Sequence, residues 1–244
     1  MIKNALKDFG PIYAINLKSK EDRLNHIKKE FSKHNIKDYT IIEAVDGSKE
    51  DLSLLVDNID SISLSKNEIA CSISHLKTIK HWLNTSNSEY AIILEDDITF
   101  ETVENWPWSW NEFLSKIEPH YDILQLCITH TERINTSLHY REIRDRSAAC
   151  YLIKRDWAEK IIGKHIVDDK FIFNNKDRAR LSADGLVYNG AICLSFPLFV
   201  SSIDFDSSIN DKNINKFYEK SRNEILNFWK LKPKGLYRKL NNNG

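Results

Sequence analysis

Strands that alternate with helices along the chain predict an α/β domain with a mixed, largely parallel central sheet. Short apolar runs that favour strands occur at residues 12–17, 90–94 and 192–200. Between them lie segments whose apolar residues recur at helical spacing, most clearly at 68–83. With 244 residues, 41% of them hydrophobic and 29% charged, the chain has the composition of a soluble globular protein with a substantial core.

The first third of the chain predicts a strand, a helix and a second strand. The run at 12–17 is followed by apolar residues at helical spacing, and Ser19 with Asp22 resembles a capping box that would start the helix near Lys20. A second strand begins at 40–42 and ends before the Asp-Gly turn signal at 46–47. Residues 50–65 are polar and irregular.

The remainder continues the alternation. Five apolar residues at helical spacing predict one buried stripe on a helix over 68–83, and the apolar run that follows it predicts a buried strand. The further elements expected are a Trp-rich helix or loop at 106–117, a strand at 122–128, a polar loop through 146, a strand at 148–153, a helix at 155–164 and a strand at 192–200.

Charge is balanced overall but unevenly distributed. Residues 212–244 carry nine basic and two acidic side chains, which gives this segment a net charge of +7 and the remainder −7. We therefore predict a domain over 1–211 and a basic amphipathic tail over 212–244 that binds an anionic membrane surface. The alternative is a terminal helix whose Phe228 and Trp229 pack on the domain. No nucleic-acid motif is present, and no nucleic-acid partner is expected.

The four cysteines form no CxxC pair and read as small buried residues in a reducing compartment. The first residues lack the apolar core of a signal peptide, and no stretch approaches about 18 apolar residues. The expected location is cytoplasmic, with the tail holding the protein on the inner face of the cytoplasmic membrane.

Three adjacent carboxylates, Glu95, Asp96 and Asp97, follow directly after the apolar run at 90–94. Ligands of α/β sheets bind outside the carboxyl ends of the strands. Neighbouring carboxylates become tolerable when a hard cation neutralises them, and Mg²⁺ or Mn²⁺ commonly shares its ligand shell with substrate phosphates. The triplet thus favours a cation that carries a diphosphate. The competing interpretation is a solvated acidic turn.

Two further groups of polar residues are candidates. Glu68 and His75 lie seven positions apart on the helix at 68–83, on the same shoulder of its apolar stripe, although a helix histidine is more often structural. Asn16, Ser19 and Arg23 follow the first strand beside a helix N-terminus, which favours an anion or nucleotide. A plain helix start with surface charges explains the second group almost as well.

These residues resemble glycosyltransferase family 25, which includes lipooligosaccharide β-galactosyltransferases and collagen galactosyltransferases. The resemblance rests on six segments in the order of the family. They are INLKSKEDR at 15–23, EAVDG at 43–47, NEIACSISH at 67–75, ILEDD at 93–97, AACYLI at 148–153 and SADGLVY at 182–188. The pair of NEIACSISH and ILEDD is the specific part.

The resemblance implies a GT-A (Rossmann-like) fold and inverting transfer of a hexose from a UDP-sugar, UDP-Gal or UDP-Glc, to a lipooligosaccharide or other lipid-linked glycan. Asp96 and Asp97 would hold Mn²⁺ or Mg²⁺ and the diphosphate, with Glu95 directed toward them. The residues that the resemblance places near the donor are Asn16, Arg23, Asp46, Ser74 and His75.

The resemblance makes Asp184 the candidate general base, since it falls where the family often has an acid in a Pro-Val-Asp setting. An inverting transfer needs such a group to take the proton of the acceptor hydroxyl. The residues before Asp184, Ser182 and Ala183, depart from the pattern of the family. No histidine follows His165, so Asp204, Asp206 or water would complete a cation shell.

Two other classes of function use the same residues. One is a catalytically inactive sugar-nucleotide or carbohydrate-binding protein of the same fold. The other is a metal-dependent phosphohydrolase, which usually needs more His and Asp ligands than this order of motifs provides.

Overall fold

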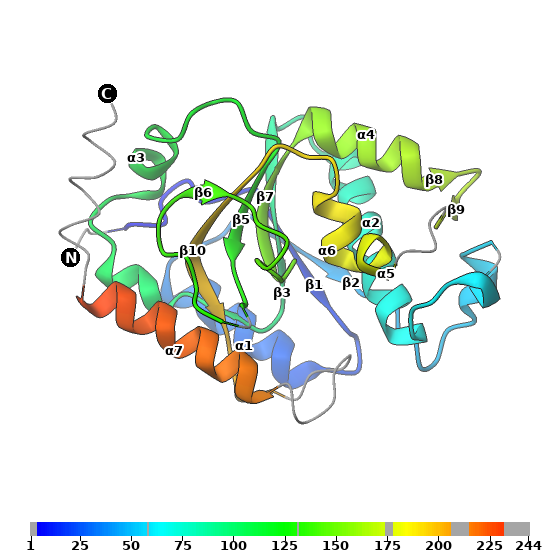
Figure 1. Ribbon diagram of the computed structural model, residues 1–244, viewed down its shortest axis with the longest axis horizontal. Coiled ribbons are helices and arrows are strands. Elements are labelled where there is room, and N and C mark those ends of the chain that lie inside the picture. The colour runs from blue at the N-terminus through cyan, green and yellow to red at the C-terminus, as the bar shows by residue number, and fades with distance from the viewer. Residues whose placement is uncertain (1–3, 58, 131, 174–177, 206–214, 232–244) are drawn as a thin grey trace.

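The computed structural model describes residues 4–57, 59–130, 132–173, 178–205 and 215–231. Its centre is a sheet with the strand order β2-β1-β3-β7-β5-β10-β4, and β6 pairs with β10 (Figure 1). The strands of this sheet are β1 (Ile12–Asn16), β2 (Tyr39–Glu43), β3 (Tyr90–Glu95), β4 (Ile98–Thr99), β5 (Ile123–Cys127), β6 (His139–Tyr140), β7 (Cys150–Lys154) and β10 (Cys193–Ser201). A separate small hairpin joins β8 (Ile166–Val167) to β9 (Lys170–Phe171).

The sheet is mixed, as the sequence predicts. β1 pairs in parallel with β2 and β3, and β5 pairs in parallel with β10. β7 lies antiparallel between β3 and β5, so the long strands on its two sides still share one direction. The α/β fold class with a mixed, largely parallel sheet is therefore confirmed.

Helices cover both faces of the sheet. The helices are α1 (Glu21–Lys33), α2 (Lys66–Thr85), α3 (Trp110–Leu114), α4 (Arg155–His165), α5 (Arg178–Leu181), α6 (Ala183–Tyr188) and α7 (Asn215–Leu231). Short 3-10 turns form η1 (Leu52–Leu54), η2 (Ile59–Ser61) and η3 (Glu101–Asn105). Buried residues of α1, α3 and α7 belong to one apolar cluster, whereas those of α2, α4 and α6 belong to a second cluster.

Alternation along β3 divides its side chains between these two clusters. Ile92 and Leu94 lie in the α1/α3/α7 cluster, and Ala91 and Ile93 lie in the α2/α4/α6 cluster. Successive side chains of a strand point to opposite faces, so a strand buried on both faces reads as a continuous apolar run. This explains why residues 91–94 are all apolar.

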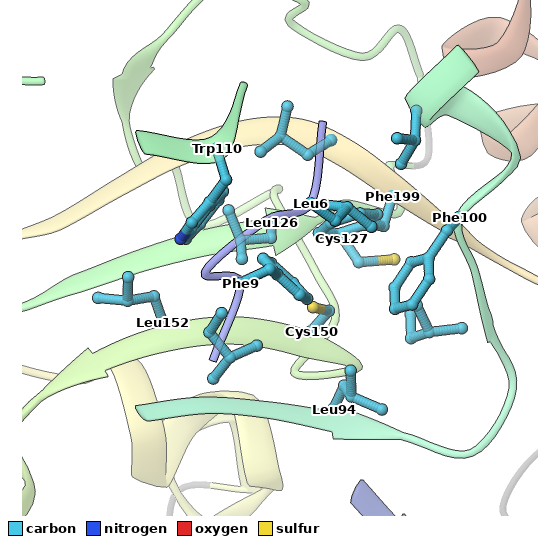
Figure 2. Close-up of a cluster of buried hydrophobic side chains, with 14 of the residues drawn as sticks. Leu6, Phe9, Leu94, Phe100, Trp110, Leu126, Cys127, Cys150, Leu152 and Phe199 are labelled. Carbon is cyan, nitrogen blue, oxygen red and sulfur yellow. The ribbon is translucent and has the colours of Figure 1, made fainter. Parts of the chain in front are cut away.

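The α1/α3/α7 cluster is rich in aromatic rings. Figure 2 shows Phe9, Phe100, Trp110 and Phe199 packed around the strand residues. The ring of Phe9 meets those of Trp110, Phe199 and Phe100 edge-on, at centroid distances of 4.8, 5.4 and 5.9 Å. Aromatic pairs in this geometry contribute about 0.5–1.5 kcal/mol beyond the area that they bury.

The helix α7 packs into this aromatic cluster. Trp229 is fully buried, and its indole N–H donates to the carbonyl oxygen of Pro197 at 2.8 Å. Ile225 and Phe228 are also buried there. Phe228 and Trp229 therefore pack on the domain, which is the alternative interpretation of the tail given above. The boundary at 211 and the basic residues of 232–244 lie outside the described residues, so the division into two parts stays a prediction.

The helix starts test the capping predictions. Helix α1 begins one residue after the predicted Lys20, but Lys20 is its N-cap and no side chain caps it, so the predicted Ser19–Asp22 capping box is wrong. A capping box does form at α2, where Ser65 and Glu68 bond reciprocally. The side chain of Glu68 therefore caps its helix, whereas the sequence placed it with His75 at a cleft edge.

Candidate functional site

A pocket of about 270 Å³ lies at the carboxyl ends of β1, β2 and β3. Its walls come from the segments that follow these three strands and from one side of α2. The pocket lies where ligands of α/β sheets bind. The predicted site residues that line it are Arg23, Asp46, Ser74, His75, Glu95 and Asp96.

The alternation of β3 continues into the acidic triplet and separates its side chains. Glu95 follows Ala91 and Ile93 in phase and reaches His75 on α2. Asp96 follows Ile92 and Leu94 in phase and reaches Arg23 on α1. Glu95 and Asp96 thus lie at the end of the strand with different partners, and Asp97 lies in the turn that follows.

Both oxygens of Asp96 are engaged. Asn16 donates its amide to Oδ2 at 2.6 Å, and Arg23 donates Nε–H to Oδ1 at 2.6 Å. Arg23 also places its other nitrogen 2.5 Å from Asp96 Oδ1 and 3.0 Å from Asp97 Oδ2. Burial alone would lower the pKa of Arg23, but the charges of Asp97 and Asp96 outweigh burial and raise it. Arg23 therefore neutralises two members of the triplet.

Asp97 keeps one oxygen unsatisfied. Its Oδ1 is buried and has no hydrogen-bond partner within the described part of the chain. Burial is the main cause that raises the pKa of Asp97 to about 7; the positive charge of Arg23 opposes this, and Glu95 and Asp96 add to it. The backbone is fixed at this point, because Ser202 donates its N–H to the Asp97 carbonyl at 2.7 Å.

Glu95 forms the other branch of the site. His75 Nε2 lies 3.5 Å from Glu95 Oε1, and His75 Nδ1 lies 3.1 Å from the hydroxyl oxygen of Tyr151. Burial by itself would raise the pKa of Glu95, but the hydrogen bond and charge of His75 outweigh it and lower the pKa. His75 is 1% exposed, so the chain holds its imidazole in one place between a strand end and a strand of the sheet.

The loop after β2 forms the opposite wall. Ser74 donates its hydroxyl to the Ala70 carbonyl at 2.7 Å and accepts the N–H of Val45 at 2.9 Å, which ties the loop to α2. A Cβ on Gly47 would lie 2.6 Å from the Lys66 carbonyl oxygen, so only glycine allows this approach. Asp46 accepts from Ser48, and that hydrogen bond lowers its pKa.

Asp184 lies in the first turn of α6 and accepts the N–H of Ser147 at 2.7 Å. Ser147 has a φ of 97°, a conformation that costs a non-glycine residue about 1–3 kcal/mol. Burial raises the pKa of Asp184, while the hydrogen bond from Ser147 and the charge of Arg141 oppose this, and the charges of Glu95 and His75 act on it more weakly. Asp184 does not line the 270 Å³ pocket itself.

One residue that the sequence analysis did not select lines the pocket, and a second lies within range of the charges of the site. Cys71 lies one helical turn before His75 and lines the pocket, and their i, i+4 spacing is a signal in the sequence. Tyr218 comes from α7; burial raises its pKa, and the charges of Glu95, Asp184 and Asp97 add to this. No local pattern could place Tyr218 there, because it comes from a helix more than a hundred residues after the acids.

The remaining candidates contribute less. Ser19 lines the pocket. Asp204 is exposed and accepts a hydrogen bond from Ser202 at 3.1 Å, and Asp206 lies outside the described residues. All four cysteines are free. Cys127, Cys150 and Cys193 are buried as expected, whereas Cys71 is only partly buried.

The donor set fits a hard divalent cation in part. The unsatisfied Asp97 Oδ1 and the carboxylate of Glu95 are oxygen ligands of the type that Mg²⁺ and Mn²⁺ prefer. Asp96 fits less well, since Asn16 and Arg23 already occupy both of its oxygens.

An acid-lined pocket at the carboxyl ends of parallel strands is typical of α/β proteins that bind a nucleotide. Residues 9–166 match the family described as glycosyltransferase family 25 (LPS biosynthesis protein). The chain therefore belongs to this family. The matched range includes the acidic triplet and α2, and it ends before Asp184 and α7.

A relative in Acanthamoeba polyphaga mimivirus carries the name "Putative glycosyltransferase R655". It is 33% identical over 123 residues, which are 48% of this chain and 37% of the relative. The match thus spans well under half of the mimivirus protein.

Solved structures show remote likeness. A197 from STIV has a TM-score of 0.41 at 11% identity and covers 78% of this chain and 82% of its own. The inositol-1-phosphate CTP transferase from T. maritima has a TM-score of 0.40 at 10% identity, with 86% and 95% covered. HddC from Yersinia pseudotuberculosis has a TM-score of 0.37 at 14% identity, with 89% and 82% covered. At these scores we draw no conclusion from them.

Within the part of the chain that the structure describes, we find no helix with the length and apolar character needed to cross a membrane.

Proposed function

We propose that the chain transfers a hexose from a UDP-sugar, UDP-Gal or UDP-Glc, to a lipooligosaccharide or other glycan acceptor, with inversion at the anomeric carbon. The observation that carries the proposal is the pocket at the ends of β1, β2 and β3, whose lining includes Arg23, Asp46, His75 and Glu95. It lies in the segment that defines the family.

The residues take distinct roles in this proposal. Asp46 and the start of α1 face the nucleotide, and His75 and Ser74 face the donor sugar. Asn16 and Arg23 act through Asp96, because their hydrogen bonds fix this carboxylate. Asp97 and Glu95 would hold Mn²⁺ or Mg²⁺, which would supply positive charge to the diphosphate. Asp96 stays a candidate ligand that must first exchange its bonds with Arg23.

Asp184 is the proposed base. The acceptor hydroxyl oxygen bonds to the anomeric carbon, its proton passes to the Asp184 carboxylate, and the bond between that carbon and the diphosphate oxygen breaks, which releases UDP. A carboxylate whose pKa burial raises is a better proton acceptor near neutral pH than an ordinary aspartate. Ser147 orients the carboxylate through its N–H.

A donor screen tests the activity. UDP-Gal, UDP-Glc, UDP-GlcNAc and UDP-GalNAc are incubated with the protein and Mn²⁺, Mg²⁺ or chelator, and UDP release is measured with and without a lipooligosaccharide acceptor. We expect one hexose donor to dominate and release to need a cation. Binding of UDP without turnover of any donor would favour the inactive sugar-nucleotide-binding alternative, and a product with retained anomeric configuration would contradict inversion.

The variants Asp97→Asn and Asp96→Asn test the assignment of the acids. We expect both to abolish transfer, Asp97→Asn with its fold intact and Asp96→Asn with reduced stability, because the buried charge of Arg23 loses its partner. Full activity of both variants at saturating UDP-sugar and cation would contradict the cation–diphosphate assignment.

The membrane proposal is now restricted to the basic residues beyond Trp229, since Trp229 itself is buried. Co-sedimentation with anionic liposomes, and none with neutral ones, would support it, because basic residues near an anionic surface contribute about 1 kcal/mol each. Absence of binding at low salt would contradict the membrane proposal and would favour a soluble glycan as the acceptor.

A further inference from the structure

The lining of the pocket includes three side chains with ligand atoms of different chemistry. They are the thiol of Cys71, the imidazole of His75 and the carboxylate of Glu95, and their sulfur, nitrogen and oxygen atoms all lie within 4.8 Å of one another. Cys71 and His75 are four residues apart on α2, which places them on one side of the helix, and the end of β3 supplies Glu95. All three line the pocket.

We propose that Cys71, His75 and Glu95 bind a zinc ion in this pocket, in competition with the cation that would carry the donor diphosphate. Sulfur and imidazole ligands select zinc over the hard cations Mg²⁺ and Mn²⁺. Three protein ligands and a fourth position open to the pocket are the arrangement of zinc sites that exchange a ligand.

The distances allow the site to form with small side-chain movements. Zinc lies about 2.3 Å from sulfur and about 2.0–2.2 Å from nitrogen and oxygen, so ligand atoms of a tetrahedral site are about 3.3–3.8 Å apart. His75 Nε2 and Glu95 Oε1 are already 3.5 Å apart. The thiol of Cys71 lies within 4.8 Å of both of these atoms, so at most a movement of about 1.5 Å completes the set.

The second ring nitrogen of His75 has the partner that a metal-bound histidine requires. With zinc on Nε2, the ring proton sits on Nδ1 and is donated to the Tyr151 hydroxyl oxygen, 3.1 Å away. The two rings also stack, with their centroids 5.8 Å apart at 30°. Such outer partners fix the ring and typically change metal affinity by about 10–100-fold.

Zinc binding must displace the thiol proton. A cysteine binds zinc as its thiolate, and an ordinary thiol is mostly protonated at neutral pH. The step is Zn²⁺ plus the protonated thiol giving a zinc thiolate and one released proton. Affinity should therefore rise with pH.

A bound zinc ion would inhibit transfer, and this consequence rests on the proposed function. Glu95 cannot serve zinc and the donor cation at once, and His75 would be withdrawn from the donor sugar. Binding itself does not depend on the transferase activity, so it is measured separately.

The test uses the full chain with Co²⁺ as the spectroscopic probe and Zn²⁺ in competition with a chromophoric chelator. We expect a thiolate-to-cobalt charge-transfer band in the wild type, release of about one proton per zinc bound, and loss of the band in Cys71→Ser. Cys193→Ser, which removes a buried thiol outside the pocket, is the matched control and should keep the band. Tyr151→Phe, which keeps the ring and removes the hydroxyl, should lower the affinity for zinc by about 10–100-fold.

The outcomes separate the two proposals. A missing thiolate band, or equal zinc affinity in wild type and Cys71→Ser, would overturn the site and place any zinc on the acids alone. If the band is present but no UDP-sugar is turned over, the zinc site stands and the proposed function fails. If both hold, zinc should inhibit UDP release reversibly, and Cys71→Ser should need at least about tenfold more zinc for the same fractional inhibition.

Discussion

The two faces of the sheet are built differently, although the same strands supply both. The face toward α1, α3 and α7 is filled with aromatic rings, including the fully buried Trp108, Trp110 and Trp229. The face toward α2, α4 and α6 is mainly aliphatic and includes buried polar side chains on α2, among them Ser74 and His75. One face is closed and stabilises the fold, whereas the other opens into the pocket.

This difference shows how a chain can hold reactive groups without losing stability. The closed face is packed with large aromatic side chains, whereas the open face carries polar groups whose hydrogen bonds fix their positions. The Ser74 hydroxyl accepts the N–H of Val45 in the loop after β2. His75 Nδ1 shares a hydrogen bond with the Tyr151 hydroxyl. The four predictions below test whether the two roles separate in this way.

The largest expected effect is on turnover and belongs to the open face. We expect Asp184→Asn to lower kcat by about 10²–10⁴-fold with little change in donor affinity, because a base acts on the acceptor hydroxyl. Steady-state kinetics with donor and acceptor measure it, and a melt without ligand should stay close to that of the wild type. Near-normal turnover would move the base role to another acid, with Asp204 the next candidate.

Trp229→Ala should have the largest effect on stability and belongs to the closed face. Removing a fully buried tryptophan and its bond to Pro197 should lower the free energy of unfolding by about 3–5 kcal/mol. Urea unfolding measures this, with Leu231→Ala as the control, since Leu231 is 80% exposed on the same helix and should change stability by less than about 0.5 kcal/mol. A mild effect of Trp229→Ala would mean that α7 is held only loosely.

A pH-dependent effect is expected at the edge between the two faces. The folded-state pKa of Asp97 is raised from 3.8 to about 7, so the native state binds a proton that the unfolded state has lost in this interval. The stability that protonated Asp97 contributes is therefore complete below about pH 4 and is lost as the pH rises to about 7.

Asp97→Asn removes this titration, so in chelator the variant should gain stability relative to the wild type as the pH rises from about 4 to 7, with no further gain above. Melting curves over this interval, compared at each pH, give the difference directly. A difference that does not change with pH would mean that Asp97 titrates normally.

The smallest expected effect is at the pocket wall. Ser74→Ala should lower the free energy of unfolding by about 1 kcal/mol, because the N–H of Val45 loses its acceptor. Loosening of the loop that carries Asp46 should raise the KM for the UDP-sugar more than it lowers kcat. If kcat falls alone, Ser74 contacts the donor directly.

Much of the fold follows from local pattern. The strands β1, β3 and β10 and the helices α2 and α4 were predicted to within about two residues, because apolar runs and helical spacing define them strongly. The predicted capping box at Ser19 was wrong, since short polar patterns match by chance. The N-cap of α1 is Lys20, and no side chain caps the helix. The antiparallel direction of β7 has no local signal.

The residues at the strand ends of the site could be predicted from the sequence, but the hydrogen-bond partners of these residues could not. The sequence placed Glu95, Asp96 and Arg23 near one another, but it could not show that Arg23 bonds the acids directly. Alternation along β3 could have separated Glu95 from Asp96 in advance, because the period of a strand extends past its last apolar residue. Tyr218 depends on how α7 folds back, which is a tertiary property.

The packing of α7 also determines how a shortened form of the chain would behave. A fragment that ends with the family-matched range, at residue 166, would lack β10 and α7 and would leave Trp106 and Trp108 without the ring of Trp229, which lies 6.0 Å from each. Contiguous aromatic surface of that kind drives self-association in water. The part of the sequence that identifies the family is therefore smaller than the part that covers its aromatic cluster.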